Sequence, residues 1–310
     1  MPELPEVTTT VRGLAKVLPG LTISSVWTDL AKKKVTRSDY HETFKSEAFY
    51  TTYRKKLVGK KVLSVERRAK NILINLSGNL TILIHMKMTG HIMYGMYTYH
   101  AKNNSWSPTS GERSSLFDPF NQFLHVVLSF SNKKHVVLSD VRKFAKVTVV
   151  PSDTIHTSTH LSSLGPEPLD ALFTFDVFIE RIYKRPKAHI KTVLMDQTLI
   201  AGIGNIYSDE MLWRASIHPL SYPQSIPRKN MRTLFIALKE VLTKGIDFGG
   251  DSTSDYRDIE GNRGSFQSHH TAYRKTGEHC SKKGCRGVIL RTVINGRSAH
   301  FCSVHQKRYQ

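Results

Sequence analysis

The spacing of three cysteines and one histidine near residue 310 limits the fold more than any other feature of the sequence. Cys280, Cys285, Cys302 and His305 follow the pattern C-x4-C-x16-C-x2-H. Proteins hold zinc with four such ligands in a tetrahedron, and a turn or hairpin usually brings two close pairs together. The runs 288–290 and 299–301 flank Asn295-Gly296, a pair typical of a tight hairpin turn.

This spacing predicts a zinc finger over residues 269–310 that holds one structural zinc ion. So short a unit has too few large apolar side chains to fold without such a staple. Four protein ligands leave no open position, so no catalytic metal is expected. His279 and His300 are alternative fourth ligands that fit the paired spacing less well. Three free thiols beside a surface histidine are the other interpretation.

The cysteines also bear on where the protein works. Three cannot all pair in disulfides, and all lie between residues 280 and 302. Disulfide frameworks belong to oxidising compartments, so we expect an intracellular location. The start MPELPEV resembles no secretion signal, and no apolar run reaches the ~18 residues that a membrane span needs.

The first 150 residues have the pattern of β-strands. Six short runs rich in β-branched residues have hairpin-like spacing: 61–66, 71–76, 80–86, 123–130, 135–139 and 145–150. They predict an N-terminal β-sandwich over residues 1–150. A helix is expected over residues 3–18, because acidic residues lie in its first turn and Pro19-Gly20 would stop it. The polar residues 97–121 are expected to form an exposed loop.

Helical patterns follow the sandwich. After a linker over 151–168, we expect a helical domain over 169–268, with helices at 174–184, 187–197, 205–214 and 228–244. Residues 246–268 are rich in Gly, Ser and Asp and are expected to be mobile. The fold class is therefore α+β, with a sandwich that carries an N-terminal helix, a helical domain and a β-hairpin zinc finger.

The charge of the chain bears on its partners. Lys and Arg total 45 against 25 Asp and Glu, which gives a net charge of +20. A generically basic protein is one interpretation and a polyanion binder is the other. The positions favour the second, because basic residues cluster at the ends of apolar runs, and residues 271–310 hold nine of them against Glu278 alone.

Two glycines precede the helix expected at 205–214, in the segment LIAGIGNIYSDE over 199–210. A dinucleotide-binding loop is a weak interpretation, because the third glycine and a clear preceding strand are missing. The glycines instead predict a tight turn between two helices. Asn205 and the amides at the start of the second helix could then hold a phosphate. A helix-capping asparagine without a ligand is the equal alternative.

Pro2 becomes chemically distinctive if Met1 is removed, which a small second residue usually allows. Its amine would titrate not far above ~8, against roughly 10.4 for lysine, and so supply more free amine at neutral pH. Amines attack sugar aldehydes or C1′ to form Schiff bases, and the neighbouring Glu3 could move the proton. Taken alone, an ordinary frayed terminus is the plainer interpretation.

Eight segments, in one order along the chain, carry a resemblance to a known family. They are PELPEV (2–7), RRAKNILI (67–74), IHMKMTG (84–90), DVRKF (140–144), LGPEP (164–168), IKTVLMDQTLIAGIGNIYSDE (190–210), TGEHC (276–280) and GRSAHFC (296–302). Together they resemble the formamidopyrimidine-DNA glycosylase and endonuclease VIII family, and its formamidopyrimidine branch more closely. Residues 190–210 look like the family's helix–two-turn–helix.

The resemblance assigns roles to matching positions. It implies Pro2 as the nucleophile, Glu3 as the general acid/base and Glu6 as a second glutamate at the lesion site. Residues implied to grip phosphates near the lesion are Lys70, Lys191, Asn205 and Arg297, and Lys70 and Arg297 are also implied in catalysis. Residues implied to fill the gap left by an everted nucleotide are Met88, Arg142 and Phe144. Taken alone, Met88 and Phe144 would be core residues and Lys70 a solvated strand end.

The resemblance implies a monomeric DNA glycosylase with abasic-site (AP) lyase activity that acts in base-excision repair, wherever the genome is. It would evert and remove oxidised bases from damaged DNA through a Pro2 Schiff base, then cut the strand by β,δ-elimination. A non-catalytic damaged-DNA-binding protein with the same domains is the alternative. That alternative predicts loss of Pro2, Glu3 or the gap-filling residues, and all are present. No protein partner is implied.

The chain departs from the family pattern in three places. The finger has C-x4-C where C-x2-C is commonest, and His305 where a fourth cysteine is usual. Residues 97–121 are longer than in typical bacterial relatives. The segment 246–268, which corresponds to the loop near the bound lesion, keeps only loose similarity, so lesion preference is the least determined property.

Overall fold

The computed structural model describes residues 1–310, which form two compact units. Unit 1 comprises residues 1–162 together with 249–265, and unit 2 comprises residues 163–248 together with 266–310. The sequence grouped 249–265 with the helical domain, whereas the structure places it in unit 1, because Ile259 joins the core of the sandwich. None of the helices combines the length and the apolarity that a membrane span requires.

Unit 1 contains the predicted β-sandwich. Its two antiparallel sheets have the strand orders β1-β8-β9-β5 and β10-β4-β3-β2. The strands are β1 (Ile23–Thr28), β2 (Val62–Arg68), β3 (Asn71–Leu76), β4 (Leu80–His85), β5 (His91–Gly95), β8 (Leu124–Phe130), β9 (His135–Ser139) and β10 (Lys146–Pro151). Buried Val, Ile and Leu side chains from both sheets form one core. The six predicted strands are present, and β1 and β5 complete the sheets.

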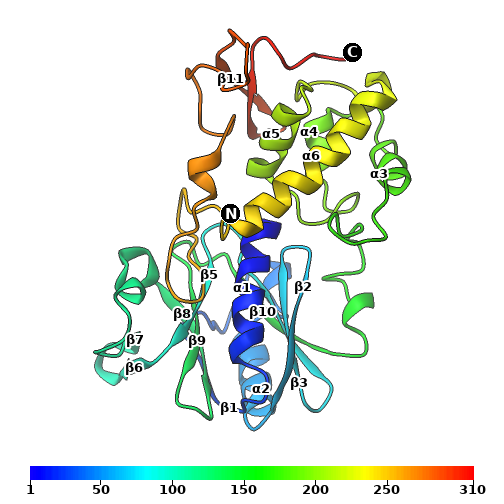
Figure 1. Ribbon diagram of the computed structural model, residues 1–310. Helices are drawn as coiled ribbons and strands as arrows, with labels where there is room; N and C mark the ends of the chain where they lie inside the picture. The colour runs from blue at the N-terminus through cyan, green and yellow to red at the C-terminus, as the bar shows by residue number, and fades with distance from the viewer. The chain divides into compact units, whose positions relative to one another are not determined.

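Helix α1 (Leu4–Val17) packs on this core through Val7, Val11 and Leu14. Figure 1 shows it running lengthwise beside β2 and β3, both of which it contacts. Its first turn forms a capping box, in which the Glu3 amide donates to Glu6 Oε2 at 2.7 Å. The predicted helix is thus confirmed, whereas α2 (Glu47–Leu57) is a helix that the sequence did not indicate.

Residues 97–121 are more ordered than the predicted exposed loop. They contain a hairpin of β6 (Tyr97–His100) and β7 (Ser105–Pro108), then the 3-10 helices η3 (Ser114–Phe117) and η4 (Pro119–Asn121). Leu116 and Asn121 are fully buried, which explains why this stretch folds back onto the sandwich.

The segment 249–265 has no regular secondary structure, but it is not the loose loop that its composition suggested. Tyr256, Arg257 and Ile259 are buried. The Tyr94 amide donates to the Ile259 carbonyl at 2.7 Å, which attaches the segment to β5. A Cβ at Gly13 of α1 would lie 2.8 Å from the Ile259 side chain, so only glycine allows this close approach.

Unit 2 holds the predicted helices and the finger hairpin. The elements are α3 (Phe175–Ile182), α4 (Ile190–Met195), α5 (Asn205–Arg214), α6 (Arg228–Asp247), β11 (Ile289–Ile294) and β12 (Arg297–Cys302). Between α4 and α5, the Gln197 side chain donates to the Met195 and Ile203 carbonyls and accepts from the Gly202 amide. This one residue fixes both turns of the helix–two-turn–helix.

Candidate functional site

The start of the chain brings the first three predicted site residues together. Pro2, Glu3 and Glu6 are all buried, with Glu3 and Glu6 only 2% and 1% exposed. The capping box holds these residues in a defined conformation at the beginning of α1, because the Glu3 amide is hydrogen-bonded to the Glu6 carboxylate. A frayed terminus would leave these side chains in solvent, so the structure does not support that interpretation.

The Glu6 carboxylate has a second partner far along the chain. Its Oε1 accepts from the Asp251 amide at 2.7 Å, and the Tyr256 hydroxyl donates to the Glu6 carbonyl at 3.0 Å. Sequence reasoning missed both Asp251 and Tyr256, because they lie in the segment whose similarity to the family is loose. The segment 249–265 therefore packs against Glu6 at the start of α1.

The three residues implied in gap filling lie on two neighbouring loops of unit 1. Met88 is in the loop between β4 and β5, while Arg142 and Phe144 are in the loop between β9 and β10. The Arg142 guanidinium lies 4.6 Å from the centre of the Phe144 ring. Phe144 is 37% exposed and Met88 is half-buried, and neither belongs to the hydrophobic core. A core role for them is therefore excluded.

Asp140 joins the two loops and was not predicted. Its carboxylate, 1% exposed, accepts from the Thr89 hydroxyl of one loop and from the amides of Arg142 and Ala145 in the other. The signal was available, because Asp140 opens the DVRKF motif and Thr89 follows Met88 in IHMKMTG.

Lys70 lies in the turn between β2 and β3 and is 5% exposed, so it is no solvated strand end. His85, the last residue of β4, lies near the charges of Lys87 and Lys70. Burial, with the neighbouring charges of Lys87 and Lys70 among the lesser causes, lowers the His85 pKa to about 3. An anionic ligand would be favoured in such surroundings.

Unit 2 carries the other predicted phosphate contacts. Lys191 in α4 is 1% exposed, and its ammonium forms an ion pair with Asp209 in α5. The other oxygen of Asp209 accepts from the His300 amide at 3.0 Å and lies 2.9 Å from His300 Nδ1. Lys191 is thus fixed in place by a carboxylate. His300 is engaged with Asp209 and lies outside the metal cluster.

Asn205 and Arg297 lie beside this lysine. Asn205 is the first residue of α5, and Gly204 occupies the N-cap position, so Asn205 is no ordinary cap. Its Nδ2 donates to Ser298 Oγ on β12 at 3.3 Å, and its buried Oδ1 has no partner. Arg297 is exposed at the start of β12. Lys191 and Arg297 line one pocket of about 280 Å³, to which Asn295 in the hairpin turn also contributes.

The finger residues converge as predicted. One ligand atom from each of Cys280, Cys285, Cys302 and His305 lies within 4.8 Å of the others. His305 Nε2 lies 3.0 Å from the Trp213 carbonyl, an orientation that leaves Nδ1 facing the thiols. The amides of Gly287 and Val304 donate to Cys285 Sγ and Cys302 Sγ, as expected for thiolate ligands. The set fits one metal ion with tetrahedral preference.

The hairpin that joins the two ligand pairs turns at Asn295 and Gly296. Both residues have positive φ, 47° and 74°, which is the geometry of a type I′ turn. Arg297 follows directly, so the turn sets the direction from which its side chain leaves the hairpin.

Two family models match the chain. The formamidopyrimidine-DNA glycosylase N-terminal domain matches residues 1–147, and the formamidopyrimidine-DNA glycosylase H2TH domain matches residues 164–257. The formamidopyrimidine-DNA glycosylase of Pelotomaculum thermopropionicum is 34% identical over 307 residues and covers 99% of both chains. That of Lactobacillus helveticus is 34% identical over 310 residues and covers 100% of both.

Solved structures of a relative agree with this fold. Lactococcus lactis Fpg in complex with DNA containing an abasic site has a TM-score of 0.80 and 28% identity, and covers 99% of this chain and 100% of its own. The wild-type enzyme in complex with DNA containing an oxidised pyrimidine has a TM-score of 0.79 and 29% identity, at the same coverage. The buried start of α1 and the cluster of three cysteines and one histidine agree with the two matched domains. The chain therefore belongs to the formamidopyrimidine-DNA glycosylase family of DNA-repair glycosylases.

Proposed function

We propose that this glycosylase removes oxidised bases from DNA with the amine of Pro2 and then cleaves the strand as an AP lyase. The observation that carries the proposal is the buried start of α1, where Pro2 stands next to Glu3 and Glu6 in a capped helical turn. A buried carboxyl group beside a secondary amine is the pair that glycosidic cleavage through a Schiff base requires.

The chemistry begins when removal of Met1 leaves Pro2 with a free secondary amine. Its lone pair attacks C1′, the C1′–N bond breaks, and the bonding electrons leave with the base, which takes up the proton that the Pro2 nitrogen gives up. Glu3 donates a proton to the ring oxygen, so the sugar opens to an iminium between C1′ and Pro2. Loss of the C2′ proton then expels the 3′ phosphate, and loss of the C4′ proton expels the 5′ phosphate. Water hydrolyses the iminium and returns the amine.

The remaining residues hold the DNA in the form that this chemistry needs. Lys191, Asn205 and Arg297 on unit 2 bind backbone phosphates, and Lys70 on unit 1 does the same near the lesion. Met88, Arg142 and Phe144 occupy the space of the everted nucleotide. The partly exposed aromatic ring, stacked with a guanidinium, is suited to replace a base in the stack.

The cluster of three cysteines and His305 holds one zinc ion, which stabilises the fold of the finger. Four protein ligands make the site closed, so the metal orders the hairpin and with it Arg297. The proposed substrates are formamidopyrimidines and oxidised pyrimidines in duplex DNA, together with abasic sites. These follow from the DNA complexes of the Lactococcus lactis relative.

Borohydride trapping tests the proposal directly. Reduction during the reaction should join the protein covalently to DNA that carries a lesion or an abasic site. An uncleaved N-terminal tag, which converts the Pro2 nitrogen into an amide, should abolish trapping. Glu3→Gln should lose most base excision and keep some abasic-site cleavage, because an abasic site already offers an aldehyde. Full trapping by the blocked protein would disprove the proline mechanism and point to a lysine, Lys70 first.

A further inference from the structure

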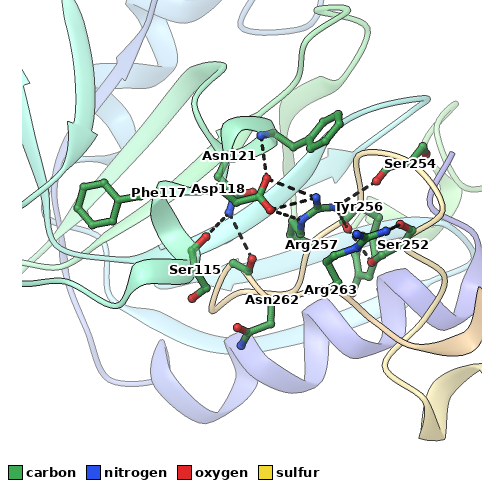
Figure 2. A network of polar contacts seen from close by, with 12 residues as sticks. Ser115, Phe117, Asp118, Asn121, Ser252, Ser254, Tyr256, Arg257, Asn262 and Arg263 are labelled. Carbon is green, nitrogen blue, oxygen red and sulfur yellow. Dashed lines mark hydrogen bonds and ion pairs between the residues drawn. The ribbon is translucent and has the colours of Figure 1, made fainter.

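Arg257 is an almost fully buried cation that belongs to no part of the proposed chemistry. The residue is 2% exposed. Its guanidinium donates through Nε and Nη2 to both Asp118 oxygens, at 3.2 to 3.4 Å, and through Nη1 to the Ser254 and Tyr256 carbonyls at 3.0 and 2.9 Å. Figure 2 shows the guanidinium between the Asp118 carboxylate and the 252–256 turn. Burying an unpaired charge costs free energy, so the fold depends on the contact between Arg257 and Asp118.

The two segments joined by this pair are far apart in sequence. Asp118 lies between η3 and η4, and Arg257 lies in the segment 249–265. Both segments belong to unit 1. The Phe120 ring, 5.0 Å from the guanidinium, covers Arg257 on the side of η4.

Further contacts between the same segments leave little freedom. Ser115 Oγ donates to the Glu260 carbonyl at 2.6 Å, and the fully buried Asn121 donates to the carbonyls of Ser115 and Gly261. Gly261 has a φ of +82°, and a Cβ there would lie 2.8 Å from the Ser115 carbonyl oxygen. We call residues 114–121 the brace, because they fix the backbone of 257–261 from one side.

The opposite side of the segment faces α1. The Asp251 amide and the Tyr256 hydroxyl both donate to Glu6, and Ser252 Oγ links Tyr256 to Gly264 by donating to the first and accepting from the second. Tyr256 is therefore bound to Glu6 by its hydroxyl, while its carbonyl accepts from Arg257. A short hydrogen-bonded path leads from Asp118 through Arg257 and Tyr256 to Glu6.

We propose that the brace is a positioning element for base excision, and that the Asp118–Arg257 pair holds the segment 249–265 against Glu6 so that the segment can retain an everted base. This inference rests on the proposed function. Neither Asp118 nor Arg257 touches the reacting atoms. They act through the hydrogen bonds that the Asp251 amide and the Tyr256 hydroxyl make with Glu6. Small displacements of such positioning groups can lower the reaction rate strongly.

The experiment separates retention of the base from the later chemistry. Asp118→Asn keeps the shape of the side chain and leaves Arg257 without its counter-charge, and Arg257→Lys keeps the charge and loses the paired hydrogen bonds. Glu260→Gln is the matched control, because it breaks an exposed ion pair, Arg113–Glu260 at 2.9 Å, between the same two segments. Single-turnover excision of a formamidopyrimidine, cleavage of an abasic site and amide hydrogen exchange of 249–265 are measured for each.

Both brace variants should lower the excision rate by roughly tenfold or more, while abasic-site cleavage stays within about twofold, because an abasic site has no base to retain. Exchange across 249–265 should accelerate in Asp118→Asn and Arg257→Lys and stay unchanged in Glu260→Gln. Wild-type excision in Asp118→Asn, or an equal loss on both substrates, would overturn the inference. If the wild-type protein excises nothing, the proposed function fails instead, and unchanged exchange in Asp118→Asn would still overturn the brace.

Discussion

Lys191 and Asp209 form a buried ion pair that ties α4 to α5. Their side chains are 1% and 0% exposed, and His300 of the finger hairpin contacts the same carboxylate. One acidic residue therefore connects both helices of the helix–two-turn–helix to the finger. A residue implied in phosphate binding is also part of the framework of unit 2.

Asp209→Asn should destabilise unit 2, because the Lys191 charge stays buried without compensation. We expect a loss of about 3 kcal/mol or more in urea unfolding followed by circular dichroism. Glu180→Gln is the control, since it breaks the exposed Glu180–Lys184 pair of 3.1 Å and should cost less than about 0.5 kcal/mol. Equal, small losses in the two variants would show that the buried pair is not structural.

Arg297→Ala and Asn205→Ala should weaken binding to lesion DNA in different ways. Loss of Arg297 removes a charge, so the slope of log affinity against log salt should fall by about one unit. Loss of Asn205 removes a neutral contact and should lower affinity with the slope unchanged. The two variants control for each other in titrations by fluorescence anisotropy. An unaltered slope for Arg297→Ala means that this residue is not at a phosphate.

Phe144→Ala should reduce excision of a modified base more than cleavage of an abasic site, because an abasic site needs less eversion work. Asp140→Asn should have the same signature without touching DNA, since Asp140 holds the loops of Met88 and Phe144 together. Val141→Ala, an exposed neighbour in the same loop, should leave both rates unchanged. Single-turnover rates on matched duplexes measure the difference, and parallel losses on both substrates contradict gap filling.

Cys285→Ser should release the metal and unfold the finger, while the β-sandwich of unit 1 stays folded. Metal analysis of the wild-type protein should return about one zinc per chain, and the variant close to none. Duplex binding should be lost with the finger. Protein purified without chelators that contains no zinc would refute the four-ligand site, though not the glycosylase chemistry.

The stability of unit 1 should fall in mild acid through His91. This residue is 1% exposed, and its Nε2 lies 2.8 Å from Asn121 Oδ1 in the brace. Burial lowers the His91 pKa from 6.5 to about 4. The unfolded chain then binds a proton before the native state does, so stability that is full above pH 6.5 decreases toward pH 4.

His91→Gln should flatten this part of the profile, because glutamine does not titrate and can still donate to Asn121. Unfolding free energies in urea at several pH values between about 4 and 7.5 measure the slope. His41→Gln, at an exposed histidine, should leave the profile as it is. A slope identical in His91→Gln and the wild type would assign the acid sensitivity to other groups.

Local sequence patterns predicted those helices and strands whose apolar residues recur with the period of the element. The strand 71–76 and the helix at 205–214 match β3 and α5 to the residue. The sequence did not predict β1 and α2. The strand sequence ISSVWT has two consecutive serines, and the helix sequence EAFYTTYRKKL is largely polar on its exposed face. Their place is determined by packing on the sandwich rather than by local propensity.

The candidate site was predictable where chemistry is carried by a motif and not where it is carried by long-range pairs. Spacing predicted the cluster that contains Cys280 and His305, which the structure brings together. The family motifs proposed roles for Pro2 and Arg297, which stay predictions. The Arg257–Asp118 pair joins residues 139 positions apart, and no local pattern encodes such a contact. Such long-range contacts order residues 97–121 and 246–268. Their composition alone predicted an exposed loop for the first and a mobile segment for the second.

The contact of Glu6 with Asp251 spans 245 positions of the chain. During synthesis on the ribosome, the N-terminal glutamate therefore emerges long before its partner, and unit 1 cannot reach its final form until residues 249–265 have left the exit tunnel. A nascent chain that stops at residue 162 carries every strand of the sandwich but lacks Ile259 in its core. The order of translation thus delays completion of unit 1 until all four α-helices of unit 2, α3 to α6, have already been made.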